Sequence, residues 1–116
     1  MLDSHILLDL ANQTGQRCAV LPPDFVAKMQ RRLRRKFKVK VAAEEIANIA
    51  AQHVVIYRFA ASVLQECLLP NDDIYASLSH IDDPKFMSKL TAQFPNEDPK
   101  VLDELANWVI QYEYLR

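Results

Sequence analysis

Residues 42–69 read AAEEIANIAAQHVVIYRFAASVLQECLL, and this stretch decides the fold. It contains neither glycine nor proline, and Pro70 follows it. Glu44 and Glu45 suit the positive end of a helix dipole. Its apolar residues recur every three or four positions, the period of an α-helix. They are Ile46, Ile49, Ala50, Tyr57, Ala60, Ala61, Leu64, Cys67 and Leu68. The stretch therefore predicts one long helix, about 42–69, at the centre of an all-α domain.

The opposite side of this long helix is also apolar, at Val54, Val55, Ile56, Phe59 and Val63. A helix that is hydrophobic most of the way round is either central in its own fold or pairs with another chain. The pattern therefore leaves a homodimer open beside a six-helix monomer.

One part of the long helix resembles a known motif. Residues 45–50, EIANIA, and residues 56–59, IYRF, are similar to the DNA-reading helix-turn-helix of tetracycline-repressor-type regulators. In that family an Ile-Ala-x-x-Ala-Gly stretch leads into a recognition helix that ends in an aromatic pair. Here Ala51 replaces the turn glycine, so we expect a continuous helix. The order of helix lengths, one moderate, one long and one short, with a basic segment between the first two, also resembles the histone fold. Members of that family dimerise and bind DNA.

Shorter helices are predicted on both sides of the long one, over residues 5–13, 22–37, 72–80, 84–94 and 99–114. Ser4 is expected to cap the first helix and Gly15 to lie just past its end. The last two begin with Asp83-Pro84 and Asp98-Pro99, an N-cap followed by proline at the first helical position. We expect a compact five- or six-helix bundle or orthogonal array, a single helical domain over residues 1–116.

Composition argues against several classes of function. Gly15 is the one glycine among 116 residues, which disfavours sheet hairpins and phosphate-cradling loops. The N-terminus has no basic segment before an apolar one, and no apolar run reaches 18 residues, so we expect a cytoplasmic protein with no membrane segment. His5, His53 and His80 lack metal-ligand spacing, and catalytic motifs are missing. We therefore expect neither enzyme activity, a cofactor nor a metal.

The net charge of −1 conceals an uneven distribution of charge along the chain. Residues 66–116 hold ten acids against four bases. Eight of the fourteen bases lie between positions 28 and 40, with no acid among them. These eight, which we call the basic ridge, are Lys28, Arg31, Arg32, Arg34, Arg35, Lys36, Lys38 and Lys40.

A helical wheel of the second helix places its apolar residues in one sector, and six members of the basic ridge fill most of the other side. These six are Lys28, Arg31, Arg32, Arg34, Arg35 and Lys38. Like charges three or four residues apart destabilise a helix by roughly 0.2–0.5 kcal/mol per pair. A ridge that retains this repulsion predicts a negative partner. We consider three negative partners: nucleic-acid phosphate, an acidic protein surface, and the acidic C-terminal part of this chain or of a second copy. The alternative is that the ridge is a solvated face with no partner. The leading hypothesis is a non-enzymatic, nucleic-acid-associated binding protein. The alternative is a protein-interaction module, such as an adaptor, chaperone or inhibitor.

Overall fold

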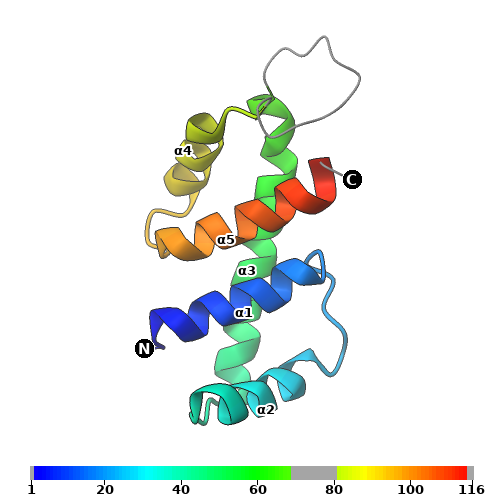
Figure 1. Ribbon diagram of the computed structural model, residues 1–116, viewed down its shortest axis with the longest axis vertical. Coiled ribbons are helices and arrows are strands. Elements are labelled where there is room, and N and C mark those ends of the chain that lie inside the picture. The colour runs from blue at the N-terminus through cyan, green and yellow to red at the C-terminus, as the bar shows by residue number, and fades with distance from the viewer. Residues whose placement is uncertain (1, 69–80, 115–116) are drawn as a thin grey trace.

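The long helix predicted from the sequence is present as α3, Ala43–Val63, and the chain continues from it into a 3-10 turn, η1, Leu64–Cys67. The computed structural model describes residues 2–68 and 81–114 (Figure 1). The other helices are α1, Ser4–Gln16; α2, Phe25–Phe37; α4, Asp83–Gln93; and α5, Pro99–Val109, extended by a π-helical turn, η3, Ile110–Tyr114. The all-α prediction is therefore confirmed. The helix predicted over 72–80 lies outside the described residues.

Three helices cross α3 on one side. Figure 1 shows α5, α1 and α2 lying one beside the next along α3, with α4 beside its C-terminal part. Helices α1 and α5 run in the same direction, and α2 runs in the opposite direction. An antiparallel bridge between Leu68 and Ile81 joins the end of η1 to the segment before α4. The arrangement makes α3 the common support of the fold.

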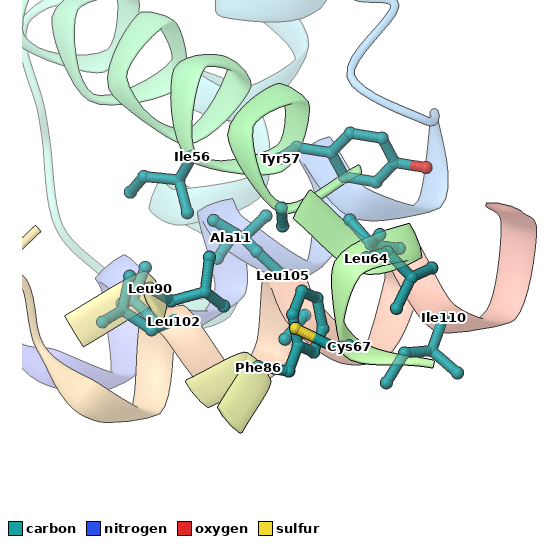
Figure 2. Close-up of a cluster of buried hydrophobic side chains, with 14 of the residues drawn as sticks. Ala11, Ile56, Tyr57, Leu64, Cys67, Phe86, Leu90, Leu102, Leu105 and Ile110 are labelled. Carbon is teal, nitrogen blue, oxygen red and sulfur yellow. The ribbon is translucent and has the colours of Figure 1, made fainter. Parts of the chain in front are cut away.

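The core consists of two clusters of buried side chains, both of which include residues of α1 and α3. The larger cluster joins α3 and η1 to α4 and α5, and Figure 2 shows Ile56, Leu64, Phe86, Leu90 and Leu105 meeting there. The smaller cluster joins the N-terminal parts of α1 and α3 to α2. It contains Ile6, Leu10, Phe25, Met29, Leu33, Val41, Ile46 and Ala50. This second cluster fixes the position of α2, and with it the basic ridge.

The second apolar side of α3 is largely covered by the chain itself. Ile56 is fully buried, and the Phe59 ring packs edge-on against Phe94 at 5.4 Å between centroids. Val55 alone on this side is strongly exposed, at 52%. Helix α3 also runs through Ala51 without a turn, and Tyr57 is in the core. The continuous helix is thus confirmed, and the helix-turn-helix geometry is absent.

Two predicted helix caps are wrong by one residue. Asp3, not Ser4, caps α1, because its carboxylate accepts a hydrogen bond from the His5 N–H at 2.7 Å. The Ser4 hydroxyl instead donates to Asp98 Oδ2 at 2.9 Å, which ties α1 to the start of α5.

The other misplaced cap is at α4. Asp82, not Asp83, accepts there from the Lys85 N–H at 3.1 Å. At α5 the predicted cap is correct, since Asp98 accepts from the Lys100 N–H at 2.9 Å. Consecutive acids each offer the right oxygen, so the spacing alone does not identify the one that caps.

Gly15 does not end α1 as predicted. It lies inside the helix and is buried, and α1 continues to Gln16. The chain leaves the helix through Cys18 and Ala19, which take the left-handed conformation with φ of 54° and 61°. The glycine is therefore required by packing and not by the turn.

Candidate nucleic-acid interface

Helix α2 presents the basic ridge because its apolar edge is anchored in the core. Phe25, Met29 and Leu33 are each at most 3% exposed and recur at four-residue spacing. Six members of the ridge lie on the other sides of the helix, and Lys38 and Lys40 follow its end. Seven of the eight are exposed, and Arg32 is half-buried. The two-sided helix predicted from the sequence is confirmed.

One carboxylate from α1 is paired with two members of the ridge. Asp9 accepts from Arg32 through both oxygens, with Nε to Oδ2 at 2.8 Å and Nη2 to Oδ1 at 2.9 Å. Lys36 Nζ reaches Asp9 Oδ1 at 3.1 Å. This bidentate contact is the geometry in which a guanidinium binds a carboxylate most strongly.

The Asp9 side chain is only 7% exposed. Burial raises the pKa of this carboxyl, but the hydrogen bonds and charges of Arg32 and Lys36 outweigh burial and hold its pKa below the usual range. Asp9 is therefore ionised at neutral pH and neutralises part of the ridge.

A second ion pair within the ridge region is exposed. Lys28 Nζ lies 3.2 Å from Asp24 Oδ2, one helical turn earlier, with both side chains more than half exposed. Exposed pairs of this kind contribute little to stability and exchange readily with other ions.

The other five members of the ridge have no ion pair with any described residue. They are Arg31, Arg34, Arg35, Lys38 and Lys40. The acids that do pair with the ridge, Asp9 and Asp24, precede α2 in sequence. Among the described residues of 66–116, no carboxylate pairs with the ridge, so the intramolecular partner found differs from the one considered from the sequence.

The last two members of the ridge, Lys38 and Lys40, lie in the segment after α2, and the conformation of this segment is fixed by two local features. Lys38 ends the helix in the left-handed conformation, with φ of 59°. The Gln30 side chain then donates from Nε2 to the Val41 carbonyl at 3.0 Å. Val41 is buried while Lys38 and Lys40 are exposed. Both lysines are thus held on the outside.

Sequence reasoning missed Asp9, and it missed Arg17, which lines a surface hollow together with four members of the ridge. Asp9 lies between Ile6 and Gln13 on the buried face of α1, and an acid at that spacing is a signal of a buried basic partner. Arg17 lies outside the run of positions 28–40, so counting contiguous bases does not find it. Its guanidinium donates from Nη1 to the Gln13 carbonyl at 2.8 Å and to Gln13 Oε1 at 3.0 Å.

His53 and Cys67, two groups noted in the sequence, lie in the core. His53 is 1% exposed on α3, and burial lowers its pKa to about 4. Cys67 is a free thiol in the core. Within residues 2–68 and 81–114, no cluster of three potential metal ligands occurs. No helix in the same ranges has both the length and the apolar character needed to cross a membrane.

Comparison of the chain with protein families, with curated proteins and with solved structures finds no match.

Proposed function

We propose that this protein binds nucleic acid, without catalysis, by placing the basic ridge of α2 against the phosphate backbone. The observation that carries the proposal is the group of five basic side chains without an acidic partner among the described residues: Arg31, Arg34, Arg35, Lys38 and Lys40. Arginine and lysine side chains that face solvent in one group supply the charge that backbone binding needs.

The rigidity of the support favours this proposal. Phe25, Met29 and Leu33 hold α2 in the core, and Arg32 is clamped by Asp9. The backbone of α2 therefore keeps its shape when a ligand arrives, so the entropy lost on binding is that of the exposed side chains and not that of the helix. Contacts of this type position a protein on nucleic acid without reading its bases. We accordingly expect little sequence preference.

A mobility-shift or fluorescence-anisotropy titration with single- and double-stranded DNA and RNA tests the proposal. Binding should weaken steeply between about 50 and 200 mM salt, with a log–log slope per phosphate contact of roughly −0.9 on duplex DNA and roughly −0.7 on single strands. The triple variant Arg31→Gln, Arg34→Gln, Arg35→Gln should lose binding while its far-UV dichroism stays unchanged. These three side chains are exposed and have no ion pair in the described chain, so folding should not depend on them.

The matched control removes three positive charges from elsewhere on the surface. Arg58→Gln, Lys89→Gln and Lys100→Gln change the net charge by the same amount but leave α2 intact. Arg58 and Lys100 are exposed, and Lys89 is half-buried with Nζ 3.7 Å from Glu66 Oε2. This control should retain most of the affinity. Absence of binding by the wild type at low salt would overturn the proposal, and equal losses in the two triple variants would overturn the assignment to α2.

A second candidate function is docking on an acidic protein surface. The specific observation in its favour is that the ridge already binds a carboxylate, since Arg32 and Lys36 both contact Asp9. Two results together would favour this function. The wild type would bind no nucleic acid, and it would bind a protein partner that the Arg31, Arg34 and Arg35 triple variant does not bind.

A further inference from the structure

Two hollows flank the α2 ridge where it faces α1, and they differ in charge. The larger, of about 500 Å³, lies around the ion pairs of Asp9 with Arg32 and Lys36, and its lining contains the acids Asp9 and Glu104 as well as these two bases. The smaller, of about 260 Å³, lies between the C-terminal end of α1 and the middle of α2. Its lining contains no acid, and we call it the basic hollow. The basic residues that line it are Arg17, Lys28, Arg31, Arg32 and Arg35.

We propose that the basic hollow is the point at which a phosphate group of the nucleic-acid backbone binds, with Arg17, the residue after α1, completing the site. This inference rests on the proposed function and goes beyond it, because it selects one place on a ridge that is charged along its whole length. Apart from its five bases, the hollow is lined by Gln13 and by the buried Met29. A single anion bound there meets charge from two helices at once.

The size of the hollow suits this ligand. Liquid water occupies about 30 Å³ per molecule, so 260 Å³ has room for a phosphate group and part of its hydration shell. Guanidinium groups match phosphate oxygens through two parallel N–H donors. Four of the five basic residues are arginines. Within the described chain, Arg17, Arg31 and Arg35 have no carboxylate on that fork, whereas Arg32 binds Asp9 through it.

Arg17 is held in place before any ligand binds. Its two hydrogen bonds to Gln13 use Nη1, and its guanidinium lies over the Phe25 ring at 5.4 Å. Phe25 is itself buried at the start of α2, so Arg17 connects the end of α1 to the helix that carries the ridge. A side chain with its rotamer already restricted loses less entropy when it contacts an anion.

The chain offers a matched pair of variants that tests the inference. Arg34 and Arg35 are adjacent, exposed, and without an ion pair among the described residues, but only Arg35 lines the basic hollow. With a labelled oligonucleotide as probe, Arg35→Gln should weaken binding about tenfold and lower the salt slope by roughly 0.9, the value for one phosphate contact. Arg34→Gln also removes a charge from the ridge, so it should weaken binding too, but several-fold less than Arg35→Gln because Arg34 does not line the hollow.

A second variant tests the contribution of α1. Arg17→Gln should weaken binding as strongly as Arg35→Gln, and Arg17→Lys should recover part of the loss because it restores the charge without the guanidinium fork. Far-UV dichroism identifies any Arg17 variant that fails to fold, and in that case the Arg34 and Arg35 comparison decides alone. Equal losses at Arg34 and Arg35 would overturn the basic hollow while leaving the proposed function intact. A wild type that binds no nucleic acid would overturn both.

Discussion

Gly15 of α1 packs directly against the base of the Trp108 side chain of α5. A Cβ atom at position 15 would lie 2.6 Å from Cγ and 2.9 Å from Cβ of Trp108, closer than non-bonded carbons approach. Trp108 is itself restrained, because its ring stacks on Tyr112 and its Nε1 lies 3.3 Å from Glu104 Oε1. The one glycine of the chain thus sets how closely α1 and α5 approach.

Gly15→Ala should therefore destabilise the protein by about 1–3 kcal/mol, the usual cost of overpacking. This is the opposite of the gain of about 1 kcal/mol that alanine brings over glycine inside an exposed helix. Urea unfolding of the two proteins gives the difference. In a double-mutant cycle with Trp108→Ala, a coupling of 0.5 kcal/mol or more is expected for residues in contact. A Gly15→Ala protein more stable than the wild type would contradict the contact.

Asp9→Asn should lower stability and strengthen nucleic-acid binding. The neutral amide loses the charge-assisted contacts with Arg32 and Lys36, at a cost of about 1–3 kcal/mol. The same change leaves the ridge one unit more positive, so the proposed affinity for phosphate should rise. Chemical denaturation and an anisotropy titration on the same samples measure the two effects.

Asp24→Asn is the control for Asp9→Asn, because its ion pair with Lys28 is exposed and little change in stability is expected.

The stabilisation that Asp9 gives to the folded protein should depend on pH in one direction. The pKa of Asp9 in the folded state lies below its ordinary value of 3.8. The carboxylate therefore contributes fully to the free energy of unfolding above about pH 4, and this contribution is lost as the pH falls through the folded-state pKa. Unchanged stability in Asp9→Asn at neutral pH would count against the clamp.

His53 should make the protein less stable in mild acid. In the folded state burial lowers its pKa to about 4, from 6.5 when exposed, and its Nδ1 has no hydrogen-bond partner among the described residues. Between these values the unfolded chain binds a proton that the folded chain does not. The free energy of unfolding should therefore fall as the pH drops, by about 2 kcal/mol between pH 7 and pH 5.

The measurement is urea unfolding at several pH values for the wild type and for His53→Leu, which has no ionisable group at this position. The variant should lack most of the fall between pH 7 and pH 5. If it unfolds at all pH values, the NMR titration of His53 in the wild type replaces it. A His53 resonance that titrates near pH 6.5 in the folded protein would show that the imidazole is not shielded as described.

At position 38, glycine should give a more stable protein than alanine. A non-glycine residue in the left-handed conformation is disfavoured by roughly 1 kcal/mol, and Lys38 has φ of 59° and ψ of 32°. Lys38→Gly should consequently be about 1 kcal/mol more stable than Lys38→Ala, although both lose the same charge. Thermal unfolding of the two variants side by side measures the difference. The reverse order would place the end of α2 elsewhere.

Local patterns predicted the helices well because helix formation depends on neighbours three and four residues apart. The period of Phe25, Met29 and Leu33 was sufficient to orient α2 and to predict an outward ridge. The predictions failed where several residues could perform the same local task. Asp3 and Ser4 are both good N-caps, and so are Asp82 and Asp83, and only the backbone geometry selects between them.

The amino-acid sequence by itself determined the fold class, the long central helix and the concentration of positive charge on α2, because each follows from composition and short-range periodicity. Only the tertiary structure decided which charges are neutralised and which remain available. Asp9 meets Arg32 from 23 positions away, and Gly15 meets Trp108 across 93. Contacts at such separations depend on how whole helices pack, and no local pattern along the chain encodes that geometry.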